Sequence, residues 1–429
     1  MFQSLLPILV KLRSRFPTVY QFLVRLAKRF MGGTFGVYPR ILANEIGAVT
    51  EILRSSQWNM VYGSGLAHER LESEFAEAVG VRHAVAVASG GVAMQMSLRA
   101  MGFKPGDEVI HQVDTCSATA MAVMNAGVTP IFADVSASTF MLDCADVGNR
   151  IVPETRALIA THMWGNPENV PALLGLARLR GLKLIEDACL GLGTIAGGRP
   201  AGSWGDVGIF SFGCSKPIQT GEGGMIVTDD ESMARELRSL RHWGDRTIEF
   251  GVRDAHQLAW NGRMSEILAG IAREQLRGYP RHLEELRDAV SEFRFFLEGL
   301  PGLSLVLGSA DAISCCSFSQ IVLRVDEILL GLSKTEFMAE LTKNGIPNWH
   351  ANFELINSLS FFRSGRWRDW ILRGDTDRVQ QNNGGAFSVA ERIFAHDGLG
   401  LGKTNFLSSG NRKHLQSVLR SLTKRQARV

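Results

Sequence analysis

One lysine is distinguished by its surroundings. Lys216 lies in an apolar, glycine-rich stretch and is the only positively charged residue between Arg199 and Arg235. A lysine in such surroundings is readily desolvated, and desolvation favours the neutral amine that attacks carbonyl carbon atoms. The sequence therefore predicts Schiff-base chemistry at Lys216.

A carboxylate precedes this lysine by 29 residues. Asp187 ends the segment 182–187, which has the pattern of a short buried strand. An amine that holds an aldehyde and a carboxylate that keeps a pyridine nitrogen protonated are two essentials of a pyridoxal phosphate site. Lys216 and Asp187 are therefore the predicted catalytic residues, with pyridoxal 5'-phosphate as cofactor.

Two further segments have features of a phosphate site. Gly90 and Gly91 lie between a predicted strand and a predicted helix, where exposed N–H groups bind anions and glycine allows close approach. Ser211 ends another predicted strand five residues before Lys216. Glycine turns are common, and an isolated Asp187 would more often be a helix cap or ion-pair partner. The prediction therefore depends on these residues occurring together and in this order.

The elements that must position these residues alternate between helix and strand from about Pro39 onward. This alternation predicts a mainly parallel sheet with helices on both faces. Ligands bind such sheets at the carboxyl ends of the strands, where Asp187, Ser211 and the glycine turn fall. The expected strands are 83–88, 108–110, 129–132, 157–160, 182–185, 207–212 and 225–228.

The chain of 429 residues is too long for one ordinary core, so two packed domains are expected. We expect a large cofactor-binding domain over residues 39–275 and a smaller α+β domain over residues 276–429. The second part should begin with a long charged helix over 281–297. Residues 367–385 are polar and turn-rich, which favours a loop or lid.

The N-terminal region differs in charge from the rest. Residues 1–44 contain seven Lys or Arg and no acid, although the whole chain carries a net charge of only +3. Apolar residues recur at helical spacing between Val19 and Phe30, with basic residues between them. Residues 1–38 are therefore interpreted as a basic amphipathic extension. Packing on its own subunit or on a dimer mate is favoured over contact with an anionic membrane surface.

The six cysteines form neither a C-x-x-C pair nor a spacing typical of zinc sites. In a chain of this length they are typical of reduced thiols in a cytoplasmic protein. No apolar run reaches the roughly 18 residues of a membrane span. We therefore expect a cytoplasmic protein without a metal site, and the net charge argues neither for nor against nucleic-acid binding.

The ordered motifs resemble the DegT/DnrJ/StrS aminotransferases over about residues 39 to 425. The resemblance implies the pyridoxal phosphate fold type I (aspartate aminotransferase-like). It also implies a homodimer whose small-molecule substrates are an amino donor, usually glutamate or glutamine, and a keto or aldehyde acceptor. That acceptor would be a sugar, a cyclitol or another biosynthetic intermediate, and no nucleic acid partner is implied. The matching segments are Thr161-His-Met-Trp-Gly165, Ile185-Glu-Asp187-Ala, Gly205-Asp206, Phe210-Ser-Phe212, Lys216, Gly221-Glu-Gly-Gly224, Asn261-Gly-Arg-Met264 and Ala390-Glu-Arg392.

The resemblance also implies a role for each matching residue. Lys216 would form the internal aldimine, Asp187 would pair with the pyridine nitrogen, and Ser211 would hold the phosphate. Asn261 would reach the phosphate of the neighbouring subunit's cofactor, which makes the active sites composite.

Three positions depart from the family's pattern. Cys116 stands where the family usually has an aromatic residue that stacks on the cofactor ring. Alternatively, a nearby aromatic residue such as Trp164 supplies that stack. Leu190 stands where a glutamine usually contacts the ring oxygen, and Gly91 where a threonine usually binds phosphate. Loss of a ring stack costs about 1 kcal/mol beyond buried area. An open pocket at Cys116 would favour an acceptor bulkier or more apolar than a keto sugar.

Two alternatives keep the scaffold but change the function. One is a lyase or other elimination enzyme, although the family's sugar dehydratases usually replace the lysine found here as Lys216. The other is a non-catalytic homologue that binds cofactor or a partner. Colour in the purified protein, and its loss on addition of glutamate, would separate these alternatives from an aminotransferase.

Overall fold

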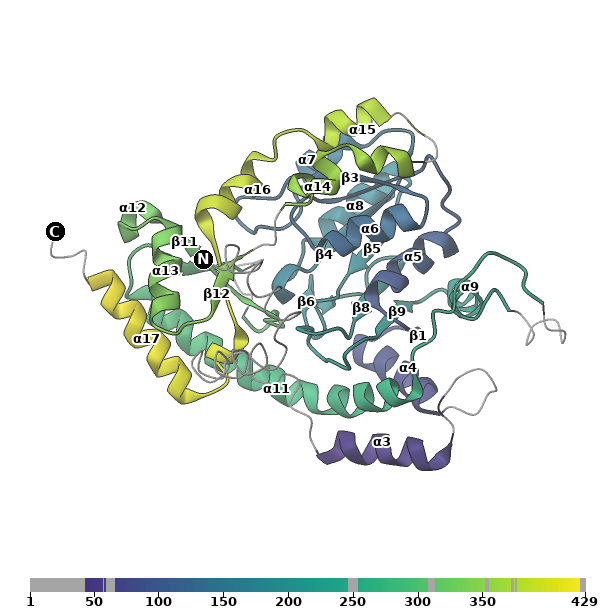
Figure 1. Ribbon diagram of the computed structural model, residues 1–429, viewed down its shortest axis with the longest axis horizontal. Helices are drawn as coiled ribbons and strands as arrows, with labels where there is room; N and C mark the ends of the chain where they lie inside the picture. The colour runs from purple at the N-terminus through teal and green to yellow at the C-terminus, as the bar shows by residue number, and fades with distance from the viewer. Residues whose placement is uncertain are drawn as a thin grey trace, which may run out of the picture.

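A seven-stranded sheet lies at the centre of the molecule (Figure 1). The computed structural model describes residues 43–56, 58, 66–245, 254–307, 313–351, 355–371, 374 and 376–424. The expected N-terminal extension, residues 1–38, lies outside the described residues. The strand order is β1-β9-β8-β5-β4-β2-β3. The strands are β1 (His83–Val87), β2 (Glu108–Gln112), β3 (Thr129–Ala133), β4 (Thr155–Thr161), β5 (Lys183–Asp187), β8 (Val207–Ser211) and β9 (Gly224–Thr228).

Strand β9 runs antiparallel to both of its neighbours, and the remaining neighbouring pairs are parallel. The prediction of a mainly parallel sheet is therefore confirmed. Because β1 and β8 are each antiparallel to β9, they run in the same direction. The carboxyl ends of β1, β8, β5, β4 and β2 thus share one edge of the sheet.

Helices cover both faces of this sheet. Side chains alternate between the two faces along each strand, so both sets are buried beneath helices. Ile185 and Ile209 belong to the core beneath the helices of one face, and Leu184 packs on the other. The first face carries α5 (Gly90–Ala100), α6 (Ser117–Asn125) and α9 (Glu231–Arg241). The second carries α4 (Leu66–Val79), α7 (Cys144–Arg150), α8 (Val170–Arg180) and the first half of α11 (Glu266–Glu298), on which α3 (Ala43–Ser55) packs.

Helix α11 links the two cores of the molecule. It is a single helix of 33 residues with Pro280 inside it, so the expected start at residue 281 is wrong. Leu276 and Leu283 pack against the large sheet, whereas Val290 and Phe293 pack in the second core. Burial on both sides of Pro280 outweighs the hydrogen bond that proline removes from a helix interior. Within the described residues, no helix combines the length and hydropathy needed to cross a membrane.

A second, antiparallel sheet forms the smaller α+β part of the fold. Its strand order is β10-β11-β13-β12. The core beneath it joins residues of α11, α13 and α17. The elements are β10 (Leu303–Leu305), β11 (Ile321–Val325), α12 (Glu327–Leu330), α13 (Lys334–Lys343), β12 (Asn348–His350), β13 (Gly398–Leu401) and α17 (Ser409–Lys424).

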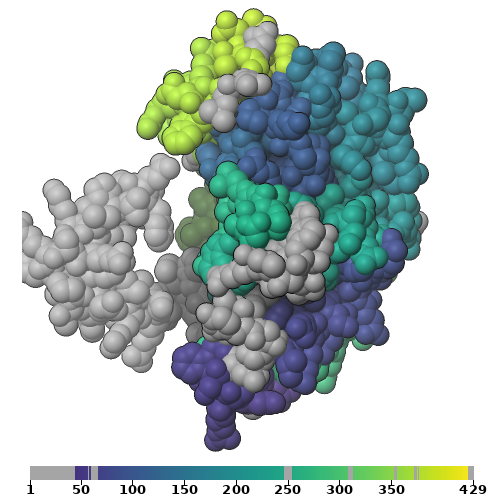
Figure 2. All heavy atoms as spheres, turned by 90° about the vertical axis from the view of Figure 1, so that its right-hand side faces the viewer, coloured from purple at the N-terminus to yellow at the C-terminus, as the bar shows by residue number. Residues whose placement is uncertain are grey.

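The segment between β12 and β13 returns to the large sheet. It contains α14 (Ser360–Arg363), α15 (Thr376–Asn383) and α16 (Ser388–Arg392). Because α15 lies within 367–385, the expected loop there is wrong, and the expected lid stays a prediction. Asn383 binds the free edge of strand β3, accepting from the Phe132 amide and donating to the Pro130 carbonyl, each at 2.8 Å. Trp367 is buried in the core between this segment and the large sheet. In Figure 2 this segment forms the yellow-green top of the molecule, against the blue of the first half of the chain.

Candidate active site

A cavity of about 300 Å³ opens at the carboxyl ends of the parallel strands. It brings together six of the seven residues predicted from the sequence: Gly90, Gly91, Cys116, Asp187, Ser211 and Lys216. Asn261, the seventh, does not line the cavity of its own chain. The other lining residues are Met94, Thr115, Ala118, Thr119, Thr161, Met163, Cys189, Leu190, Ile209, Cys214, Ser215 and Gln320.

Three adjacent strands each end in a polar residue on the floor of this cavity. Thr161, Asp187 and Ser211 end β4, β5 and β8. Two positions before each of them is an isoleucine that is buried in the core beneath α5 and α6: Ile159, Ile185 and Ile209. Side chains alternate along a strand, so all three project toward those helices. Thr161 was not identified from the sequence as a site residue, because its place beside Asp187 depends on the pairing of β4 with β5.

The carboxylate of Asp187 is fixed by neutral donors. The Thr119 hydroxyl donates to Oδ2 at 3.2 Å, and the Cys189 amide donates to Oδ1 at 3.2 Å. Asp187 is 8% exposed, and no cationic side chain of the described chain pairs with it. A buried carboxylate without a cation favours a positively charged or proton-donating partner. Sequence reasoning missed Thr119, whose role depends on the first turn of α6 reaching the end of β5.

The loop that carries Lys216 is held in place by hydrogen bonds between its backbone and two glutamine side chains. The Lys216 carbonyl accepts from the Gln219 side chain at 3.0 Å, and the Gln219 amide donates to Gln275 of α11 at 2.6 Å. Ser215, directly before the lysine, has a left-handed φ of 74°. Such strain in a non-glycine residue persists only where the surrounding structure imposes it. The Lys216 Nζ itself has no hydrogen-bond or ion-pair partner among the described residues, so the amine is available at the cavity.

The amino end of α5 forms the predicted anion cradle. Ser89 caps the helix by accepting from the Val92 amide at 3.2 Å, which leaves the first N–H groups directed at the cavity. A Cβ at Gly90 would lie 2.9 Å from the Ser211 Cβ and 3.1 Å from the Cys189 Sγ. Glycine is therefore required at this position.

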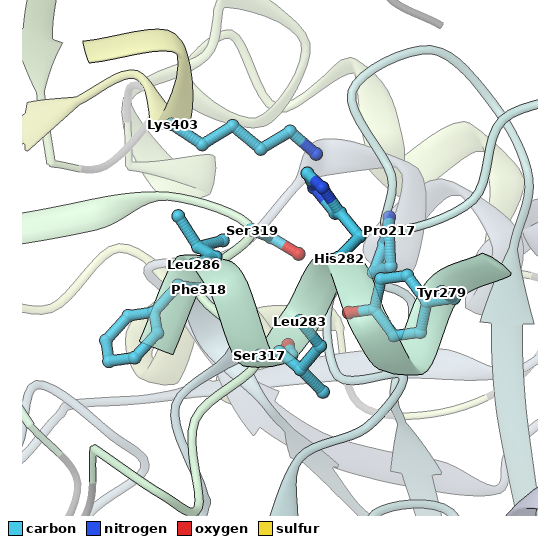
Figure 3. A pocket seen from close by; sticks show the side chains of 9 residues that line it. All are labelled: Pro217, Tyr279, His282, Leu283, Leu286, Ser317, Phe318, Ser319 and Lys403. Atoms are coloured by element: carbon cyan, nitrogen blue, oxygen red, sulfur yellow. The ribbon is translucent and has the colours of Figure 1, made fainter. Parts of the chain in front are cut away.

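The opposite side of the cavity is more apolar. Leu190 lines it, and the hydroxyls of Ser317 and Ser319 hold the Leu190 carbonyl at 2.9 and 2.7 Å. Figure 3 shows both serines beside Leu283 and Leu286 of α11, in a hollow next to Pro217. This hollow has no room for a water molecule, so it supports the site and is not itself a ligand site.

The two candidates for the ring-stacking position lie in different environments. Trp164 is 1% exposed, donates its indole N–H to the Ala351 carbonyl at 2.7 Å and packs edge-on against Phe140. It does not line the cavity, so the alternative in which Trp164 supplies the stack is wrong. Cys116 lies at the cavity, exposed, at the start of α6.

Asn261 lies on an exposed surface. It pairs with His242 in an isolated bridge, close to Trp243 and Leu258, which are 39% and 76% exposed. Exposed large apolar side chains of this kind are typical of contact surfaces. The expected contact of Asn261 with a neighbouring subunit stays a prediction.

Comparison with known proteins gives concordant results. Over 244 residues the chain is 38% identical to a UDP-N-acetyl-3-dehydro-α-D-glucosamine 3-aminotransferase of Acidithiobacillus ferrooxidans, covering 56% of this chain and 64% of that protein. It is 35% identical to a GDP-perosamine synthase of Vibrio cholerae, covering 61% of this chain and 70% of that protein. The crystal structure of S. venezuelae DesV in complex with a ketimine intermediate superposes with a TM-score of 0.76 at 28% identity, covering 89% of this chain and 94% of that chain.

A structure of 3-amino-5-hydroxybenzoic acid synthase also superposes, with a TM-score of 0.76 at 23% identity, covering 92% of this chain and 98% of that chain; it supports the fold alone. Residues 39–365 match a single family along most of the chain. The protein belongs to the DegT/DnrJ/EryC1/StrS aminotransferase family.

Proposed function

We propose that this protein is a pyridoxal phosphate-dependent aminotransferase that moves an amino group from an amino acid, glutamate or glutamine, to a keto group of a sugar-like acceptor. One observation carries the proposal: Lys216, whose amine has no partner among the described residues, and Asp187, a buried carboxylate with no cation paired to it there, line the same cavity. One relative is named for a UDP-linked keto sugar, which supports this class of acceptor.

The residues present fit the cofactor. Pyridoxal 5'-phosphate supplies, when bound, an aldehyde carbon and a pyridine ring that withdraws electrons. Lys216 would hold the aldehyde carbon, and Asp187 would hold the proton on the ring nitrogen. The N–H groups at Gly90 and Gly91, with the Ser211 hydroxyl, would bind the phosphate, since a helix amino end favours anions.

Lys216 would also move a proton. Its free Nζ would accept the proton from the Cα of the amino donor and would later give up a proton as a general acid. The apolar side chains of Met163 and Leu190, which line the cavity, would keep water away from the reacting atoms. The net reaction would convert the donor amino acid to a 2-keto acid, with one water molecule consumed, and the acceptor's ketone to an amine, with one water molecule released.

The proposal includes a homodimer with composite sites. Asn261 is exposed beside Trp243 and Leu258, outside the cavity of its own chain. A second copy packed on this surface would bring Asn261 to the phosphate end of the neighbouring cavity. The free thiols favour the cytoplasm as the compartment.

The test is spectroscopic. Protein purified with pyridoxal 5'-phosphate should be yellow, L-glutamate or L-glutamine should bleach it, and the 2-keto acid should appear in equal amount. Borohydride reduction and peptide mapping should place the cofactor on Lys216, and Lys216→Ala is the matched control. Release of ammonia without bleaching would indicate the lyase alternative. A colourless protein that does not bind the cofactor would refute the proposal.

A further inference from the structure

Thr161 has a buried hydroxyl that no part of the described chain satisfies. The residue is 4% exposed, and its Oγ1 has no hydrogen-bond partner. It lines the cavity beside Asp187. A buried hydroxyl without a partner is unfavourable, so such a group at a cavity indicates a ligand atom that pairs with it.

The sheet fixes the side of the cavity on which Thr161 lies. Thr161 is the direct neighbour of Asp187 in the register of β4 and β5. Ser211 ends β8, on the other side of β5, and Gly90 adjoins Ser211. Thr161 and the phosphate cradle therefore lie on opposite sides of Asp187.

This order determines which edge of a pyridine ring Thr161 would face. In pyridoxal 5'-phosphate, one edge of the ring carries the phosphate arm and the other carries the methyl group and the ring oxygen. If Asp187 held the nitrogen and Gly90 and Ser211 held the phosphate, the second edge would lie toward β4. Its polar atom is the ring oxygen, and Leu190, also at the cavity, has no polar side-chain atom to offer it.

We propose that the Thr161 hydroxyl donates a hydrogen bond to the ring oxygen of the cofactor, the contact that Leu190 cannot make. This inference rests on the proposed function, because it requires the cofactor. Gln320 is the rival donor, since it also lines the cavity, but it is partly exposed, so water can satisfy its amide N–H groups, whereas the Thr161 hydroxyl is buried.

The experiment measures the proton affinity of the nitrogen that joins Lys216 to the cofactor, read from the visible absorbance as a function of pH. A donor at the ring oxygen withdraws negative charge that would otherwise stabilise the protonated nitrogen. Thr161→Val, which keeps the shape and removes the hydroxyl, should raise the pKa of this nitrogen by about one unit, a tenfold change. Thr161→Ser should titrate like the unaltered protein.

Two further variants make the result specific. Leu190→Gln added to Thr161→Val should return the pKa toward its original value, because the amide supplies the missing donor. Gln320→Leu should leave the pKa unchanged. In the cofactor-free protein, Thr161→Val should not lower the melting temperature, but the rise on cofactor binding should be smaller than in the unaltered protein.

Two outcomes would overturn the inference. In the first, Thr161→Val titrates like the unaltered protein. In the second, Gln320→Leu produces the shift. Both leave the proposed function intact, provided the protein is yellow and bleached by an amino donor; a colourless unaltered protein would refute both proposals.

Discussion

Asp187→Asn separates a catalytic carboxylate from a structural one. Asparagine has nearly the same shape but cannot hold a proton on the pyridine nitrogen. It keeps one oxygen that can accept from Thr119 or Cys189, each of which now donates at 3.2 Å. The cofactor should therefore still bind, whereas proton transfer at Lys216 should slow.

The two effects differ in size. Losing one of two long hydrogen bonds costs about 1 kcal/mol of stability. Losing a hydrogen bond to a charged ring costs about 1.5–3 kcal/mol, which corresponds to a fall of roughly 10- to 150-fold in the rate of the amino-donor half-reaction. This range is a lower bound, because a buried ion pair adds electrostatic energy to the bond.

The assay is a single turnover with glutamate, followed by loss of visible absorbance and normalised to bound cofactor. Asp206→Asn is the matched control: Asp206 accepts from Lys183 at 2.6 Å and the Leu184 amide at 2.9 Å, and it does not line the cavity. The control should lose stability and keep its rate. An Asp187→Asn protein that melts earlier but turns over normally would show that Asp187 is structural.

Four other changes test separate features. Lys216→Arg should abolish the visible chromophore, because a guanidinium does not deprotonate to attack an aldehyde; borohydride labelling of another lysine would refute the assignment. Mixed dimers of Lys216→Ala and Asn261→Ala chains should regain activity through one complete site, and verified heterodimers without recovery would contradict a composite site. Cys116→Phe should spare the amino-donor half-reaction and block a bulky acceptor, so unimpaired turnover in both halves would exclude an open pocket there. Burial raises the pKa of the Glu168 carboxyl from 4.5 to about 7. Between these pH values the folded protein keeps a proton on Glu168 that the unfolded chain releases, so the contribution of Glu168 to the free energy of unfolding falls as the pH rises. Glu168→Gln should therefore gain roughly 3 kcal/mol relative to the unaltered protein between pH 4.5 and pH 8 in urea unfolding, and parallel profiles would contradict this.

Local patterns predicted the parallel sheet and the cavity because both depend on short segments. Asp187 and Ser211 end strands, and strand ends in a parallel sheet meet at one edge. Thr119 and Thr161 escaped prediction because their significance arises from neighbours in space. Thr119 matters because the first turn of α6 reaches the end of β5, and Thr161 because β4 pairs with β5 in register.

Two errors in the second half of the chain have a related cause. Proline normally ends a helix, but α11 continues through Pro280 because it packs in two cores. The polar composition of α15 predicted a loop, but buried Asn383 satisfies the edge of β3 with its amide. A polar residue that pairs with an exposed strand edge is indistinguishable, in sequence, from one that faces water.

The positions of the departures from the family's pattern bear on substrate choice. Lys216 and Ser211, which match the pattern, lie with Gly90 on the β8 side of Asp187, where the cofactor's phosphate would be held. Of the three departures, Gly91 lies at the same phosphate cradle, whereas Leu190 follows β5 itself and Cys116 follows β2, beyond β4. Every reaction of the cofactor needs the first group, whereas the ring oxygen and the incoming acceptor would meet the second. Variants of the residues on the β8 side should therefore lower the activity with every substrate by the same factor. Variants at Leu190 and Cys116 should instead change which acceptor reacts fastest.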